Sequence, residues 1–210
     1  MNITVIGATG MVGSRVVAEA VARGHQVTAA ARRPASLPAG MARPVTADAS
    51  NPADLDRALE QADTAVLSVR AVPGREDSFL DITRAVLDAA ARARVHLLVV
   101  GGAGPLRSPD DPDVAVLDDP RYVPAAWRAV AATSVNQLEV CREGSNRDWT
   151  YVSPAAILEP GVRTGSYRRG TTTLLTGTDG TSSISTEDFA VAIVDELESP
   201  TPDPWITFAH

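Results

Sequence analysis

The sequence predicts an α/β fold in which helices cover both faces of a doubly wound parallel sheet. Three observations predict it. Short apolar runs alternate with alanine-rich helical stretches, the first run ends in a glycine-rich turn, and a helical pattern follows that turn directly. Alternation of this kind implies right-handed crossovers and a parallel sheet. The length of 210 residues suits one domain, so we expect residues 1–210 to form a single domain.

Each expected element follows from a local pattern. Strands are expected where apolar residues run together, and helices where they recur every three or four positions. The expected strands are 2–6, 26–30, a short piece at 44–46, 64–69, 95–100, 149–153 and 205–208. The expected helices are 11–23, 53–61, 79–92, 125–143 and a last one capped at Ser185. Residues 105–124 contain five prolines and predict a loop, and residues 160–183 predict a hairpin.

Charge and composition exclude several function classes. The chain has 26 acidic and 19 basic residues and a net charge of −7. This charge does not suit nucleic-acid binding, which needs a basic surface. All the basic residues are arginine, so the chemistry of a Schiff-base lysine, a P-loop lysine or a Tyr-x-x-x-Lys pair is excluded. No apolar stretch has the length of a membrane span. We therefore expect a cytoplasmic protein with a small-molecule substrate, no nucleic acid or membrane partner, and a monomeric or homodimeric state.

The turn after the first expected strand has the spacing of a dinucleotide-binding loop. Gly7 allows a tight turn, Gly10 lets the backbone approach a pyrophosphate, and Gly13 permits close packing of the helix on the strand. The helix that follows presents free N–H groups, and its dipole favours an anion. Because the loop follows a strand and begins a helix, its context favours dinucleotide binding over a glycine-rich turn without a ligand.

The end of the second expected strand indicates which dinucleotide is bound. An acidic residue at that position holds the ribose 2′-hydroxyl of NAD. This sequence has Arg32 and Arg33 instead, and a guanidinium group matches phosphate oxygens. The alternative is that one or both arginines only face solvent. We expect NADPH to be preferred over NADH.

Five segments carry a resemblance to a known family. They are 7–13 (GATGMVG), 32–34 (RRP), 98–104 (LVVGGAG), 149–155 (WTYVSPA) and 184–190 (ISTEDFA). These segments resemble bacterial NAD(P)H–flavin reductases, which are atypical short-chain dehydrogenases close to the NmrA-like group and the biliverdin-IXβ/flavin reductases. The likeness covers nearly the whole chain. It implies a Rossmann-type fold, a nicotinamide cofactor, and hydride transfer to an isoalloxazine or another planar acceptor.

The resemblance also implies which residues bind the cofactor. The pyrophosphate would lie against Gly7, Thr9, Gly10, Met11 and Val12, and the 2′-phosphate against Arg32 and Arg33. The adenine would lie by Asp48 and Ala49, and the ribose by Ser68, Val69 and Arg70. The nicotinamide would be framed by Gly102, Ala103, Pro154, Ala155, Ala156 and Ile157. Ala103 stands where biliverdin-type relatives have a serine, which argues against a biliverdin-like substrate.

The acceptor is expected between residues 105–127 and 157–183. Gly104 belongs to a glycine run that either lets a flat ring lie against the backbone or forms only a tight turn. Trp127 and Tyr167 are candidate acceptor contacts, with packing as the alternative for each. Three arginines in the second segment are candidates for the phosphate of FMN, or else surface charge; they are Arg163, Arg168 and Arg169.

A general acid or base is hard to find. His25 precedes its expected strand and His96 lies near the start of its own, both at the edge of the sheet away from the cofactor, and His210 is the last residue. Tyr122 comes nearest to the place of a catalytic tyrosine, but no lysine follows it. No metal is expected, because the aspartates of residues 110–119 lack the spacing of a metal-binding loop and suit a solvated loop. Cys141 and Tyr151 are expected in the core.

Three functions are compatible with these residues. The first is an NADPH-dependent reductase of a free flavin or a similar planar acceptor, since direct hydride transfer to a flavin needs no acid or base at the site. The second is a reductase of a quinone or enone metabolite. The third is an NmrA-like sensor that binds the dinucleotide without turnover.

Overall fold

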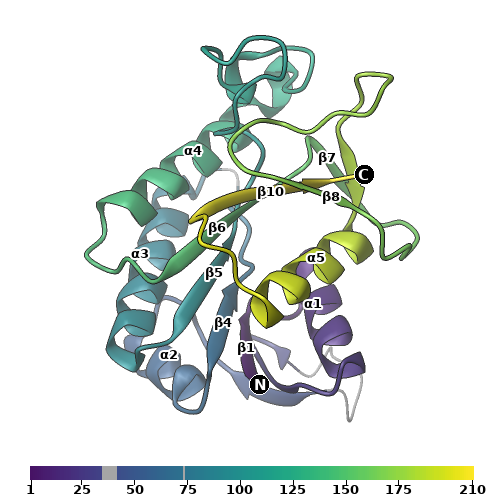
Figure 1. Cartoon of the computed structure of the whole chain (residues 1–210). Helices are drawn as coiled ribbons and strands as arrows, with labels where there is room; N and C mark the ends of the chain where they lie inside the picture. Colours follow the sequence, from purple (N-terminus) through teal and green to yellow (C-terminus); the bar gives the residue numbers. More distant parts are fainter. Residues whose placement is uncertain (35–41, 73) are drawn as a thin grey trace.

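The computed structural model describes residues 1–34, 42–72 and 74–210. Its centre is an eight-stranded sheet with the order β3-β2-β1-β4-β5-β6-β10-β8 (Figure 1). All neighbouring strands are parallel except β8, which pairs antiparallel with β10 at the edge. The strands are β1 (Asn2–Ile6), β2 (Gln26–Ala31), β3 (Arg43–Thr46), β4 (Thr64–Leu67), β5 (His96–Val100), β6 (Trp149–Pro154), β8 (Arg168–Gly170) and β10 (Trp205–Ala209). A separate parallel pair joins β7 (Ile157–Glu159) to β9 (Ser183–Ser185).

Helices cover both faces of the sheet, as expected for a doubly wound fold (Figure 1). On one face lie α1 (Met11–Ala22) and α5 (Thr186–Glu198), whose apolar residues join those of the strands in one buried cluster. On the other face lie α2 (Pro52–Leu59), α3 (Glu76–Ala93) and α4 (Arg128–Glu143), which contribute to a second cluster. This arrangement is a Rossmann-type α/β fold in a single domain, and it confirms the predicted fold class.

The predicted helices and central strands are present, with ends shifted by a few residues. The helix predicted from residue 79 begins at Glu76, and the one predicted from residue 125 begins as a 3-10 turn, Ala125–Trp127. Ser185 caps α5, since its hydroxyl oxygen accepts a hydrogen bond from the backbone N–H of Asp188 at 3.0 Å.

The predicted hairpin in residues 160–183 is wrong. Within the described chain, no two strands of this segment pair with each other; β8 pairs instead with the free edge of β10. The residues after β8 bond to the proline-rich loop, where the N–H of Arg107 donates to Thr172 O (2.8 Å) and the N–H of Leu174 donates to Arg107 O (2.9 Å). Leu174 is buried with Leu106 and Val116 in a third small cluster. The two segments expected around the acceptor therefore form one packed unit beside the sheet.

Candidate functional site

The glycine turn at the end of β1 has the close approach that its spacing predicts. Gly7 has a φ of +89°, and a Cβ there would lie 2.3 Å from the carbonyl oxygen of Ser68. A Cβ on Gly13 would lie 2.3 Å from the carbonyl oxygen of Gly7. Neither approach tolerates a side chain. The first turn of α1 also contains no acidic residue, so its N–H groups and dipole favour an anion.

A smaller cavity of about 360 Å³ lies beside this turn. It is lined by residues expected around the pyrophosphate, the 2′-phosphate, the adenine and the ribose, namely Gly7, Thr9, Gly10, Arg32, Asp48, Ala49, Ser68, Val69 and Arg70. Arg75, which begins the turn into α3, also lines it. Arg33 is exposed and lines neither this cavity nor the larger one that adjoins it. The two neighbouring arginines therefore differ, since Arg32 lines the smaller cavity and Arg33 does not.

The smaller cavity is cationic. Arg32, Arg70 and Arg75 line it, and no described residue forms a hydrogen bond or ion pair with their guanidinium groups. Its only carboxylate among the described residues is Asp48, which accepts hydrogen bonds from the N–H (2.9 Å) and hydroxyl (2.7 Å) of Ser50. These bonds hold the pKa of Asp48 below its usual value. Three arginines against one engaged carboxylate suit a ligand with several phosphate charges.

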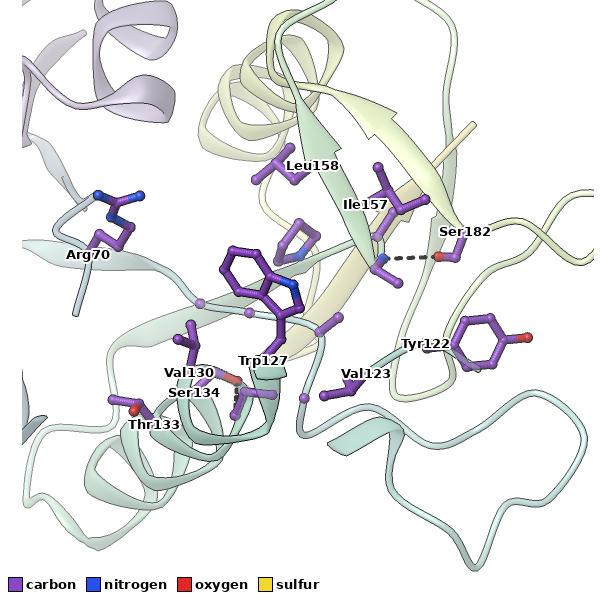
Figure 2. Close-up of a pocket in the computed structure, with 18 of the residues that line it drawn as sticks. Arg70, Tyr122, Val123, Trp127, Val130, Thr133, Ser134, Ile157, Leu158 and Ser182 are labelled. Atoms are coloured by element: carbon purple, nitrogen blue, oxygen red, sulfur yellow. Dashed lines mark hydrogen bonds between the residues drawn. The ribbon is translucent and has the colours of Figure 1, made fainter. Parts of the chain in front are cut away.

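A larger cavity of about 1020 Å³ continues from the smaller one. Both are lined by Gly10, Ser68, Val69, Arg70 and Phe79. The larger one also takes in the remaining residues expected at the cofactor, which are Met11, Val12, Gly102, Ala103, Pro154, Ala155, Ala156 and Ile157, as well as Gly104. Figure 2 shows Trp127 projecting into the space between Val130 and Leu158. A ligand can therefore run from the cationic end, past the glycine turn, into a wide apolar chamber.

Packing explains the glycine run after β5. A Cβ on Gly101 would lie 2.0 Å from Cζ of Tyr151, and one on Gly104 would lie 2.5 Å from the carbonyl oxygen of Ala131. Tyr151 is buried, as expected, and its hydroxyl donates to the carbonyl of Ser134 at 2.8 Å. The run thus lets β5 approach β6 and α4, whether or not a flat ring lies against it.

A network of ionic hydrogen bonds holds the loop before α4. Asp119 is buried and accepts bonds from the hydroxyl of Ser108 (2.8 Å) and from Nε (3.0 Å) and Nη2 (2.6 Å) of Arg121. The Arg121 guanidinium holds the pKa of Asp119 well below its usual range. Arg121 also lies over the ring of Tyr122, 5.3 Å from its centroid. The aspartates of this loop were expected to be solvated, and Asp119 departs from that expectation because it anchors the loop.

Residues 7–200 match the family described as NAD(P)H-binding. The chain belongs to the NAD(P)H-binding family. The uncharacterized protein YwnB of Bacillus subtilis (strain 168) is 33% identical over 202 residues, which are 95% of this chain and 93% of that protein. A solved structure named "putative exported protein", from Burkholderia pseudomallei, is 36% identical with a TM-score of 0.88, and all of both chains is covered. A "putative NADH-flavin reductase" from Streptococcus pneumoniae TIGR4 is 30% identical with a TM-score of 0.88, covering 100% of this chain and 99% of that one.

In this NAD(P)H-binding protein, several sequence-based candidates lie away from the cavities. Tyr167, predicted as an acceptor contact, packs edge-on against Phe208 with ring centroids 5.3 Å apart, and its hydroxyl donates to Asp195. Tyr167 packs on the α5 face and is not among the described residues that line the larger cavity, so the structure gives its predicted role no support. Among the helices of the described ranges, none has the length and apolar character needed to cross a membrane.

The three arginines predicted as candidates for an FMN phosphate are also engaged elsewhere. Arg163 pairs with Glu19, with Nη2 2.8 Å from Oε1. Arg168 donates to the backbone carbonyls of Thr176 and His210. The third, Arg169, pairs with Asp203 and Glu196. None is among the described lining residues of either cavity.

The histidines and the cysteine stand where the sequence suggested. His96 begins β5 and lies 2.6 Å from Asp148, while His25 lies 2.8 Å from Glu198. His210 contacts the buried Asp188. Cys141 is fully buried in α4, and burial raises the pKa of its thiol to about 12.

Some residues of this NAD(P)H-binding protein that line the cavities have no clear signal in the sequence. Arg75 and Phe79, at the start of α3, line the smaller cavity. Gln137 is buried two turns into α4, and its amide nitrogen has no hydrogen-bond partner among the described residues. The remaining ones on the acceptor side are Val123, Pro124, Val130, Thr133, Ser134, Leu158 and residues 179–182.

Proposed function

We propose that this protein is an NADPH-dependent reductase that delivers hydride to a free flavin or a similar planar, conjugated acceptor. The observation that carries the proposal is the continuity of the two cavities. A cationic pocket beside the glycine turn opens into an apolar chamber with room for a ring system. Membership of the NAD(P)H-binding family and the similarity to a "putative NADH-flavin reductase" support it.

The residues of the cationic pocket would bind and orient the cofactor. The N–H groups at the start of α1 would receive the pyrophosphate, and Arg32 would pair with the 2′-phosphate. Ala103 and the segment 154–157 would form the walls against which the nicotinamide lies. When bound, NADPH would supply a hydride from C4 of its nicotinamide, and a flavin would take that hydride at N5 and a proton from water at N1.

The chain's own part in the reaction would be positioning and exclusion of water. Apolar side chains such as Trp127, Val130 and Ile157 would hold the acceptor ring close to the nicotinamide. Tyr122 lines the chamber, but in Figure 2 its hydroxyl points away from Trp127. Among the described lining residues there is no histidine. A reaction that needs no proton donor on the protein fits this site best.

The test is anaerobic stopped-flow absorbance with NADPH and excess riboflavin, repeated with NADH. We expect protein-dependent bleaching of the flavin that is faster with NADPH. Ala103→Trp fills the nicotinamide wall and should slow bleaching by on the order of 100-fold, since displacing a reactant by about 1 Å can cost that much. Ala103→Ser adds one atom at the same position and is the matched control, with bleaching close to that of the native chain.

Two results would contradict the proposal. One is tight NADPH binding with no reduction of a flavin or of a quinone such as menadione, which would favour the sensor. The other is flavin reduction that Ala103→Trp leaves unchanged while circular dichroism shows the variant to be folded. In that case the reaction does not occur at this wall.

A further inference from the structure

Charge is divided unequally along the continuous cavity. At the cofactor end, Arg32, Arg70 and Arg75 face a single carboxylate. At the other end lie the acceptor-side walls, defined here as residues 121–124, 127, 130, 157–158 and 179–182. Among the described residues, the charged groups of these walls are Arg121 and Asp179.

The one arginine of the acceptor-side walls is already engaged. Its Nε and Nη2 bond Asp119, its Nη1 bonds Asp110, and Nη2 also contacts the hydroxyl of Ser108 at 3.2 Å. The two carboxylates that bind Arg121, those of Asp119 and Asp110, therefore carry more negative charge together than its guanidinium group carries positive charge. Asp179 adds a further negative charge, and the N–H of Thr181, 2.9 Å away, keeps the pKa of Asp179 below its usual value. An anion entering this end meets net negative charge.

Two hydroxyl groups of α4 that line the same chamber are not free to donate to an anion. The hydroxyl of Thr133 donates to the carbonyl of Ala129 at 3.0 Å, and that of Ser134 donates to the carbonyl of Ala131 at 2.7 Å. Both protons are therefore committed within α4. A phosphate bound here would lose water without gaining a free charged donor, which is unfavourable.

The same walls expose large apolar side chains. Trp127 is 63% exposed, Ile157 is 46% exposed and Val130 is 41% exposed, and all three line the same chamber. Figure 2 shows the indole of Trp127 between Val130 and Leu158. An exposed apolar patch that is concave and continuous is typical of a binding site. A flat aromatic ring could stack on such an indole.

We propose that the acceptor-side walls select an uncharged, apolar ring system and disfavour the same ring when it carries a phosphate or sulfonate. The proposal rests on the proposed function and names its substrate class. Among flavins it means that riboflavin is preferred to FMN. Among quinones it means that menadione is preferred to an anionic naphthoquinone sulfonate.

The decisive comparison is between riboflavin and FMN, which have the same isoalloxazine ring and differ in the phosphate. With NADPH saturating, we expect kcat/KM to be about tenfold higher for riboflavin at low salt, from like-charge repulsion at moderate dielectric. The ratio should shrink as NaCl screens the repulsion. Quenching of tryptophan fluorescence by each flavin, in the presence of NADP⁺, measures the same preference without turnover.

A charge placed in the wall provides a second test. Val130→Arg introduces a cation on the exposed face of α4. It should raise both kcat/KM and binding affinity for FMN several-fold relative to the values for riboflavin. Val130→Gln has a comparable reach without the charge and should leave the ratio as in the native chain. Both variants change a partly exposed helical position, so folding is expected to be retained.

The outcomes separate this proposal from the proposed function. If FMN binds as tightly as riboflavin, or is reduced as efficiently, the selection of uncharged rings is refuted even though the reductase remains. If no acceptor is reduced but riboflavin still quenches fluorescence at lower concentration than FMN, the reductase fails and the selection of uncharged rings stands. Failure of Val130→Arg to shift the ratio would show that charge is not what the walls select.

Discussion

Arg32 offers the sharpest test of how this protein binds its cofactor. The side chain lines the smaller cavity, whereas that of Arg33, the next residue, does not. A charged hydrogen bond to phosphate contributes about 1.5–3 kcal/mol. Arg32 is exposed, so the lower end of that range applies. At about 1.4 kcal/mol per factor of ten, Arg32→Ala should weaken NADPH binding about tenfold.

The assay is a titration of NADPH and NADH into each variant, followed by nucleotide fluorescence at low and moderate salt. NADH lacks the 2′-phosphate, so its affinity should change less than about twofold on Arg32→Ala. Arg33→Ala removes the same charge from the chain and is the matched control, with the NADPH-to-NADH ratio preserved. The double variant of Arg32 and Arg75 should lose more NADPH affinity than Arg32→Ala alone, because both side chains line the same cavity.

Two observations would refute the reasoning. If Arg32→Ala weakened the binding of NADPH and of NADH equally, this arginine would not contact the 2′-phosphate. A loss of NADPH preference in Arg33→Ala as large as in Arg32→Ala would mean that net charge matters and position does not.

Three further predictions concern stability and reactivity. Gly13→Ala puts a Cβ against the carbonyl of Gly7, so it should destabilise the folded protein by about 2 kcal/mol and lower its Tm by about 4–8 °C. It should also weaken NADPH binding. The control Gly144→Ala makes only ordinary contacts and should change neither the Tm nor NADPH binding. The thiol of Cys141 should resist Ellman's reagent at pH 8 until denaturant is added, because its pKa is raised to about 12; rapid labelling of the native chain would contradict its burial. Tyr167→Phe should cost about 1 kcal/mol of stability and leave acceptor kinetics unchanged. A changed KM for the acceptor would restore Tyr167 as a contact.

Local patterns were enough to predict the scaffold and which residues gather at the smaller cavity. The apolar run of β1, the spacing of Gly7, Gly10 and Gly13, and the position of Arg32 after β2 are all short-range features. In a parallel sheet, residues that follow strands gather at one edge, so the structure brings Asp48 and Ser68 to the same cavity without further information.

Features that depend on distant partners could not be predicted in this way. Nothing near Gly101 in the sequence reveals that the ring of Tyr151, fifty residues later, occupies the space of its missing side chain. Likewise, β8 has no partner within its own segment and finds one on β10. Because that pairing directs the chain across the α5 face, Tyr167 and Arg163 end up in structural contacts there.

The acidic loop shows how such a distant arrangement bears on function. Its aspartates have no metal-binding spacing, and the sequence therefore suggested only solvated charge. In the fold, Ser108 and Arg121 meet at Asp119, which buries this carboxylate and neutralises the guanidinium of Arg121 at the edge of the chamber. The same contacts that order the loop thus engage the cation that an anionic acceptor would need. Under the proposed selection of uncharged rings, the packing of the loop would set the charge of the preferred acceptor, and releasing Arg121 by Asp119→Asn should lessen the discrimination against FMN.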